Sequence, residues 1–598
     1  MAVSAVVADW SGARYLEGND ETLEEYMTQS RVESNMNTDD YTLTAFTLNT
    51  DEGVTVQYRG KNYKFTVEIT TSGNSAKVTY GSSEDSENPP IEEGFVPQTD
   101  GSWNEEKKVN SPELFEGMTA VYWDTSGVEH ELTEANSEAE WDQWYDYNGQ
   151  GDGQNKWANA VTKDSSGNIT GYWVWIPRYA YKIERGLFTS TAGTISVKFL
   201  QNTSDLDEEG KTIERTFEYS GNAMTDFVVH PAFRNGTDNK FMLGEWDEEV
   251  SGFWVAKYEA GYQANTITNN NGTLSTTISN ADDTVVYSDL YYTSYNINWT
   301  SNALEQDLSE TGYSNERISY PVFLPLTYSY NNICIGDSYT LAGKIDIANN
   351  FYGLNSSTTD SHMMKNSEWG AVAYLAQSSY GRAGVEITIN DYYTNTSSLF
   401  GSAITGLASS DGSQGHTQDL SNVAVSNVAA YNTTNGMKGS TTGNITGIYD
   451  LSGGLWEKIA GYIQNRNLTD GDSSGVLIGA TSTANPDGYL TLSTRTYTVY
   501  PYNNGDDDSD LNYERYKELF ISLSGTYGYG DAILETSVGE RTTDSWNSDS
   551  SYYTNTPYSF FTRGGYYGNS FFAGLFSFHN STGGAESNGG FRIVLVNE

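Results

Sequence analysis

Short apolar runs separated by long polar stretches dominate the chain from about residue 111 to its end. Trp173–Ile176, Phe253–Tyr258 and Tyr320–Leu326 are apolar runs of strand length, and Gly, Asn, Ser, Thr and Asp fill the segments between such runs. Runs of this length bounded by turn-forming residues are typical of buried β-strands. The pattern therefore predicts a β-rich domain with long irregular loops.

Helical periodicity is confined to two places. Between Ser367 and Gln377, apolar residues recur at spacings of three and four, at Trp369, Val372, Ala373 and Ala376. This spacing predicts a helix, and the preceding Asn366 and Ser367 offer an N-cap. A second, shorter helix is expected over Tyr513–Phe520.

The first 110 residues have a different texture. Four runs, at 41–48, 54–58, 63–69 and 76–80, indicate strands of a small unit, with a hairpin turn at 59–62 and a short helix expected over 20–33. Residues 81–110 are acidic and contain Pro89 and Pro90, which favours a linker. We therefore predict an N-terminal α/β or β unit over 1–80, a linker over 81–110 and one large domain over 111–598. The N-terminal unit is a candidate for contact with an assembly partner.

Three polar stretches are too long for minimal connections and are expected to be insertions or functional loops: 264–282, 395–445 and 465–512. No repeat of fixed period is visible, which argues against a solenoid.

Charge and cysteine content exclude several classes of protein. Lys and Arg total 32 against 79 Asp and Glu, a formal net charge of −47 that repels nucleic acid and anionic lipid. One cysteine, Cys334, cannot form a disulfide within the chain. No apolar stretch is long enough to span a bilayer. An acidic chain rich in Tyr, Gly, Asn and Thr is typical of exposed bacterial or viral proteins, so we expect an extracellular, cell-surface or virion-surface location.

Four segments in order carry a family resemblance. They are Phe253–Glu259, Asn366–Tyr374, Gly447–Glu457, and Arg563–Gly565 followed by Ala573–Gly574 and Gly590–Leu595. Together they resemble the formylglycine-generating-enzyme (sulfatase-modifying factor) version of the C-type lectin fold, over roughly 165–598. Two further segments, Trp173–Tyr181 and Ser361–Asn366, resemble bacterial and prophage surface proteins that carry this fold.

The resemblance implies an α+β, β-rich domain of C-type-lectin-like type, but it does not extend to the enzyme. That activity depends on a pair of cysteines in the C-terminal part, and after Arg563–Gly565 this chain continues with Tyr566, Tyr567 and Gly568. Thiol chemistry needs a thiolate, so we expect no enzyme. Histidine-dependent iron chemistry is not expected either, because His130, His230, His362, His416 and His579 lack ligand spacing.

Two charged pairs are expected to hold this fold together. Arg563 and Arg592, if brought near Glu368 and Glu457, would form buried charge-assisted pairs.

The segment 551–590 combines Tyr and Phe with Ser, Asn and Gly and has no Lys. Such a mixture is typical of a binding surface, because rigid rings supply contact area and small polar residues adapt. The segment resembles the variable proteins of diversity-generating retroelements. The resemblance implies a fixed scaffold of Arg563, Gly564, Gly565, Ala573, Gly574, Phe576, Phe591 and Arg592, with Phe578 also expected to be buried. It implies a displayed, ligand-binding set of Tyr558, Ser559, Thr562, Tyr566, Tyr567, Asn569, Ser570, Phe571, Phe572, Ser577, His579, Asn580, Ser581, Thr582, Glu586, Ser587 and Asn588.

These observations predict a non-enzymatic surface protein whose C-terminal segment binds a protein or glycan ligand. Alternatives are a structural pilus-tip or phage-fibre subunit and, further from the pattern, an enzyme of the sulfatase-modifying type. No cofactor is required. A site for a structural Ca²⁺ remains an alternative. Asp470–Gly475 resembles the first half of an EF-hand calcium loop, but Thr481 stands where that loop needs an acidic residue. The acidic run 506–510 is expected to be a solvated loop.

Overall fold

The computed structural model describes the strands at 41–45, 54–58, 61–70 and 75–79, and then residues 95–597. Within 95–597 it leaves out 152, 237–245, 267–320, 332, 334, 344, 347–348, 395–401, 411, 413–427, 464–496, 502–508, 524–527, 540–542, 556–557 and 585. The chain divides into two compact units, one of residues 1–97 with 133–141 and one of residues 98–132 with 142–598. The second unit begins before the predicted boundary at residue 111.

The first unit contains a four-stranded antiparallel sheet in the order β1-β2-β3-β4. Its strands are β1 (Tyr41–Ala45), β2 (Val54–Tyr58), β3 (Lys61–Thr70) and β4 (Ser75–Thr79). The predicted strands are confirmed, while the expected turn at 59–62 shortens to the two residues between β2 and β3. The unit also includes α4 (Glu138–Trp141). The helix predicted over 20–33 lies outside the described residues.

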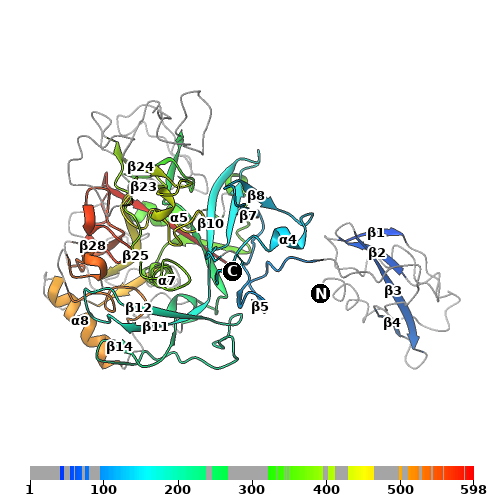
Figure 1. The fold of residues 1–598 in the computed structure, drawn as a ribbon, viewed down its shortest axis with the longest axis horizontal. Helices are drawn as coiled ribbons and strands as arrows, with labels where there is room; N and C mark the ends of the chain where they lie inside the picture. The colour runs from blue at the N-terminus through cyan, green and yellow to red at the C-terminus, as the bar shows by residue number, and fades with distance from the viewer. Residues whose placement is uncertain are drawn as a thin grey trace, which may run out of the picture. The chain divides into compact units, whose positions relative to one another are not determined.

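A seven-stranded antiparallel sheet forms the centre of the second unit, in the order β20-β30-β16-β10-β9-β7-β8 (Figure 1). Its strands are β7 (Met118–Trp123), β8 (Glu129–Leu132), β9 (Asn159–Lys163), β10 (Ile169–Pro177), β16 (Gly252–Ala256), β20 (Thr359–Met363) and β30 (Ile593–Asn597). Trp254 pairs with Trp175 on one side and with Leu595 on the other. The C-terminal strand is thus held inside the sheet, between strands from two distant parts of the chain.

A second sheet is organised around β25 (Trp456–Ile463). This strand runs parallel to β26 (Thr498–Tyr500) and β29 (Gly589–Phe591), and antiparallel to β27 (Phe560–Arg563). The next strand, β28 (Phe578–Ser581), pairs with β27. The predicted binding segment therefore occupies three strands of this sheet and the connections between them.

Helix α7 (Asn366–Gln377) packs against β25 of the second sheet, and all twelve of its residues are buried. The 3.6-residue pattern predicted this helix, and the structure confirms it. The expected cap is wrong by one residue: Lys365 is the N-cap, and its backbone N–H donates to the Glu368 carboxylate at 2.8 Å. A carboxylate in the first turn can satisfy a backbone donor that the helix leaves free.

Shorter elements complete the unit. The remaining helices are α5 (Ile335–Ala342), α6 (Asn349–Tyr352), α8 (Ser509–Ser522), and the 3-10 turns η2 (Pro231–Phe233), η5 (Gly436–Gly439), η7 (Trp546–Ser548) and η8 (Ser570–Phe572). The remaining strands are β5 (Trp103–Asn104), β6 (Val109–Asn110), β11 (Tyr179–Arg185), β12 (Thr194–Phe199), β13 (Tyr219–Ser220), β14 (Ala223–Met224), β15 (Val228–Val229), β17 (Gly261–Thr266), β18 (Pro321–Val322), β19 (Thr327–Ser329), β21 (Tyr393–Thr394), β22 (Ser402–Ala403), β23 (Leu407–Ser409) and β24 (Val428–Ala430).

Six of these elements correct the sequence analysis, and a seventh confirms it. Strands β5 and β6 pair within the stretch predicted to be a linker. The stretch 395–445, expected to be a loop, contains β22, β23, β24 and η5 in its described part. Helix α8 confirms the predicted second helix and begins four residues earlier than expected.

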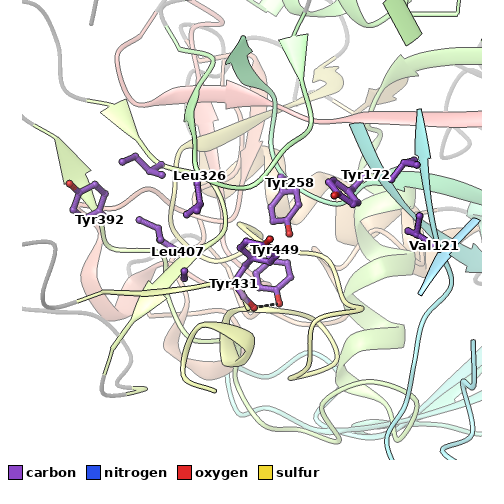
Figure 2. Packing of buried hydrophobic residues seen from close by; sticks show 11 residues of the cluster. Val121, Tyr172, Tyr258, Leu326, Tyr392, Leu407, Tyr431 and Tyr449 are labelled. Carbon is purple, nitrogen blue, oxygen red and sulfur yellow. Dashed lines mark hydrogen bonds between the residues drawn. The ribbon is translucent and has the colours of Figure 1, made fainter. Parts of the chain in front are cut away.

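Tyrosine rings fill much of the core (Figure 2). Tyr258 stacks on Tyr449 with ring centroids 5.4 Å apart, and the Tyr449 hydroxyl donates to the carbonyl of Tyr431 at 2.8 Å. Buried tyrosines need such partners because an unpaired hydroxyl in the interior is costly. The described part of the molecule is strand-rich with few helices, as the apolar pattern predicted. None of its helices is long and apolar enough to cross a lipid bilayer.

Candidate ligand-binding face

Two glycines shape the start of the predicted binding segment. Gly564 and Gly565 follow β27 with φ of 83° and 75°, values that side chains other than glycine adopt at a cost. A Cβ on Gly565 would lie 2.5 Å from the Cβ of Ala573, and the N–H of Gly574 donates to the carbonyl of Gly564 at 3.0 Å. The glycine pair thus lets the chain leave the strand and lets residues 573–574 return against it.

A buried ion pair holds β29 and β30 against β25. The Arg592 guanidinium donates through Nε to Glu457 Oε2 at 2.9 Å and through Nη2 to Oε1 at 2.5 Å. It also donates to the carbonyls of Ala256 and Tyr449. Both side chains of the pair are fully buried. The predicted pairing of Arg592 with Glu457 is confirmed.

Two further carboxyl groups surround this pair. Burial raises the pKa of Asp450 to about 6 and holds the pKa of Glu259 well above its usual range. Asp450 accepts hydrogen bonds from the N–H of Gly406 and the amide of Asn390, and the N–H of Leu455 donates to Glu259. We name Glu259, Asp450, Glu457 and Arg592 the central frame. Its members come from three of the four segments that carried the family resemblance.

Arg563 does not form the ion pair that the sequence suggested. Its guanidinium donates to the backbone carbonyls of Asp531 and Ala532 at 3.2 Å and lies over the rings of Trp369 and Phe578. Backbone acceptors and aromatic faces replace a carboxylate here.

Glu368 has different partners. Its carboxylate contacts Lys365 Nζ at 3.1 Å and His362 Nε2 at 3.0 Å, and His362 Nδ1 contacts Asp360 at 2.7 Å. His362 is therefore part of a buried charged cluster rather than a lone histidine, and the carboxylates raise its pKa against the effect of burial. His230 is a buried core residue, and burial holds its pKa well below the usual range. His416 lies outside the described residues.

The residues predicted to be scaffold are all buried: Arg563, Gly564, Gly565, Ala573, Gly574, Phe576, Phe578, Phe591 and Arg592. Phe576 and Phe578 are fully covered, as predicted, but Leu575 and Ser577 are buried as well, so the expected alternation of buried and exposed residues is not seen.

The set predicted to be displayed divides in two. Twelve members keep at least part of their surface: Tyr558, Tyr566, Asn569, Ser570, Phe571, Phe572, His579, Asn580, Thr582, Glu586, Ser587 and Asn588. Five are buried, which corrects the expectation that they are displayed: Ser559, Thr562, Tyr567, Ser577 and Ser581. Three of the buried hydroxyl groups have partners inside the structure: Ser559 donates to the carbonyl of Asn555, Thr562 donates to the carbonyl of His579, and Ser577 bonds to Ser550.

Five rings form what we call the aromatic face, and each of them is at least partly exposed to solvent: Tyr552, Tyr566, Phe571, Phe572 and His579. The Tyr552 and His579 rings lie 4.7 Å apart, and those of Phe571 and Phe572 lie 4.1 Å apart. The segment beside Tyr552 joins the two groups, because the N–H of Ser550 donates to the carbonyl of Phe572 at 3.0 Å. Phe571 is 52% exposed, which is unusual for so large an apolar side chain.

Sequence reasoning missed two members of this neighbourhood. Tyr552 does not belong to the predicted set. The ring of Trp456 lies beside two of the exposed rings, with its centroid 5.3 Å from that of His579 and 6.4 Å from that of Tyr566. Trp456 itself is buried. Its place after a glycine pair at the start of β25 gave no signal that it would support the displayed rings.

One cavity borders the aromatic face at Phe571, and a second cavity has no lining residue from that face. The first, of about 20 Å³, enough for a single water, is lined by Asp549, Phe571 and Arg382 among others. The second, of about 490 Å³, has no lining residue from the predicted set and is bordered by Trp246 and six carboxylates: Asp100, Glu113, Asp247, Glu248, Glu249 and Asp360. Burial raises the pKa of Glu113 to about 7.

No group of three or more His, Cys, Asp or Glu side chains suited to a metal ion occurs within the described ranges. The calcium-like stretch 470–475 and most of the acidic run 506–510 lie outside these ranges, as does Cys334.

No protein-family model matches the chain, and no curated protein sequence matches it.

Proposed function

We propose that this protein is a non-enzymatic surface protein that binds a protein or glycan ligand through the aromatic face. The domain that presents this face is proposed to be of C-type-lectin-like type, related to the formylglycine-generating-enzyme fold and to retroelement-diversified proteins. Segments 253–259, 447–457 and 590–595, which suggested that relationship, meet in the central frame.

One observation carries the proposal: the division of residues 558–592 into a buried scaffold and a partly exposed set of rings and small polar side chains. A diversified binding protein needs a fixed backbone that supports surface residues whose identity can change. Here the glycine turn, the Arg592–Glu457 pair and the buried phenylalanines supply the first. Tyr566, Phe571, Phe572 and the neighbouring Asn and Ser residues supply the second. Large rings of this kind dominate the energy of many interfaces.

The proposed location is extracellular, on a cell or a virion, with the N-terminal unit available for an assembly partner. No cofactor is needed for binding of this kind.

The proposal is tested by sequencing codons 551–598 in sister isolates and in a passaged culture. We expect substitutions at the partly exposed positions, such as Tyr566, Phe571, His579 and Asn580. We expect none at Gly564, Gly565, Phe591 or Arg592. The first ninety codons of the second unit serve as the internal control for the background rate. Substitutions spread evenly over scaffold and displayed positions would refute a diversified binding face.

A further inference from the structure

Lys257 is a lysine without solvent exposure, located directly after β16. Its Nζ contacts Asn159 Oδ1 at 2.7 Å and the carbonyl of Ile445 at 2.5 Å. The Trp123 ring lies over the amine, with its centroid 4.1 Å from Nζ. The amine is therefore held in one place, against a side-chain carboxamide, in an interior from which water is excluded.

The carboxamide of Asn159 is held as firmly as the amine. Its Nδ2 donates to the carbonyls of Trp157 at 2.9 Å and Thr446 at 2.8 Å, and Asn159 is 1% exposed. These two bonds fix which end of the amide is oxygen and which is nitrogen. They also fix the Asn159 Cγ beside the Lys257 amine, because Cγ carries the oxygen that the amine contacts.

Strand register brings a carboxyl group to the same side of the sheet. Val121 pairs with Asn159, Tyr172 pairs with Val161, and Trp123 pairs with Glu129. Alternation along the strands therefore places Glu129, Trp123, Asn159 and Tyr172 on one face, the face whose tyrosines and Val121 appear in Figure 2. The Tyr172 hydroxyl donates to Glu129 at 2.9 Å.

The electrostatics suit an amine that reacts rather than one that stays charged. Burial holds the pKa of Lys257 well below its usual range, and the charge of Glu129 opposes that shift. Burial also raises the pKa of Glu129. The lowered pKa of Lys257 and the raised pKa of Glu129 both favour the uncharged forms, which are a neutral amine as nucleophile and a carboxyl group able to exchange protons.

We propose that Lys257 and Asn159 are joined by an intramolecular amide bond. The neutral Nζ attacks Asn159 Cγ, a new Nζ–Cγ bond forms, and the bond from Cγ to Nδ2 breaks. One proton moves from Nζ to the departing nitrogen, which leaves as ammonia, and nothing is oxidised or reduced. Glu129, on the same face of the sheet, acts as the proton carrier for this transfer, and the rings of Trp123 and Tyr449 lie over the amine, with centroids 4.1 Å and 6.0 Å from Nζ.

Such a bond would link β9 to the end of β16 across the intervening β10. The chain has one cysteine, so it cannot make a disulfide between these strands. Proximity is the main requirement for the reaction, because fixing two reacting groups in contact removes most of the entropic barrier to their combination.

The experiment is mass spectrometry of the purified full-length chain followed by peptide mapping. We expect the intact protein to be lighter than its sequence by one ammonia. We also expect a branched peptide that contains both Lys257 and Asn159. Lys257→Met should have its full mass and should give the two peptides separately. Glu129→Gln should form the bond more slowly, and Glu129→Asp should recover part of the rate.

Succinimide formation at an Asn-Gly pair, such as Asn588-Gly589, also releases ammonia. The branched peptide separates the two reactions, and mild alkaline treatment reverses the succinimide alone. Asn159→Asp adds a second check, since its linked product releases water and is identical to the linked product of the natural chain. A natural chain that keeps its full mass after prolonged incubation, with Lys257 and Asn159 in separate peptides, would overturn the proposal.

Discussion

Arg592 of the central frame and the rings of the aromatic face belong to the same C-terminal segment, yet their side chains meet opposite conditions. Arg592 and Glu457 have no solvent exposure and satisfy each other with charged hydrogen bonds. Phe571, twenty-one positions earlier, is half exposed, and its ring centroid lies 4.1 Å from that of Phe572. One short segment can therefore combine a buried, charge-paired residue with exposed rings, because glycines carry the turn between them.

The largest effect on stability is expected from removing the cation of the central frame. Arg592→Met leaves Glu457 buried without its partner and frees the carbonyls of Ala256 and Tyr449. We expect a loss of about 3–5 kcal/mol in the free energy of unfolding, the usual cost of stranding a buried charge. Urea unfolding of the full chain measures it.

The matched control is Arg515→Met, because Arg515 pairs with Glu518 on the exposed side of α8. An exposed pair contributes about 0.5 kcal/mol or less. Equal losses of unfolding free energy in the two variants would show that the buried Arg592–Glu457 pair contributes no more to stability than an exposed pair.

A second, smaller effect is expected at the glycine turn that separates scaffold from face. Gly565→Ala combines a positive φ of 75° with overlap against Ala573. We expect a cost of about 1–3 kcal/mol. Gly210→Ala is the control, since Gly210 has a φ of 76° and nothing within 4 Å of the added Cβ. If thermal unfolding gave both variants the same loss, the close approach of residue 573 would not matter.

A third prediction uses pH to compare interior and surface carboxyl groups. Burial and the nearby Asp531 raise the pKa of Glu535 to about 8 from its ordinary 4.5. The folded chain therefore binds a proton that the unfolded chain releases, so stability is highest at low pH and falls as pH rises from about 4.5 to about 8. Glu535→Gln keeps the acceptor for Tyr181 and Gly530. The substitution should reduce the slope of the unfolding free energy against pH by up to about 1.4 kcal/mol per pH unit.

Urea midpoints at about pH 5 and about pH 8 give that slope. Glu518→Gln, on the exposed side of α8, should leave it unchanged. A steeper slope in Glu535→Gln would contradict a protonated Glu535 in the folded state.

Much of this architecture could be predicted from the sequence. The spacing of Trp369, Val372, Ala373 and Ala376 gave α7, and the apolar run at 253–258 gave β16, because periodicity reports burial directly. The burial of Phe576 and Phe578 was also predicted, although Leu575 and Ser577 are buried beside them.

Partner choice and exposure were harder to predict. Arg563 was expected to find a carboxylate, but backbone carbonyls of the segment 531–532 take that place. Ser559, Ser577 and Ser581 have the composition of displayed residues, yet all three are buried, and Ser577 bonds to Ser550 of another segment. Both outcomes depend on which distant segments pack together, and no local pattern records that.

The smallest effect on stability is expected where the proposed function is concentrated. Replacing Tyr566, Phe571 and Phe572 together with Ala should change the free energy of unfolding by about 1 kcal/mol or less, since partly exposed side chains contribute little to folding. Phe576→Ala is the matched control. The same type of ring, four positions from Phe572 but fully buried, should cost about 3–5 kcal/mol. Thermal unfolding of the two variants tests both values. A triple variant that unfolds as readily as Phe576→Ala would mean that the exposed rings serve the fold, which would leave no physical reason to keep large apolar side chains at the surface for a ligand.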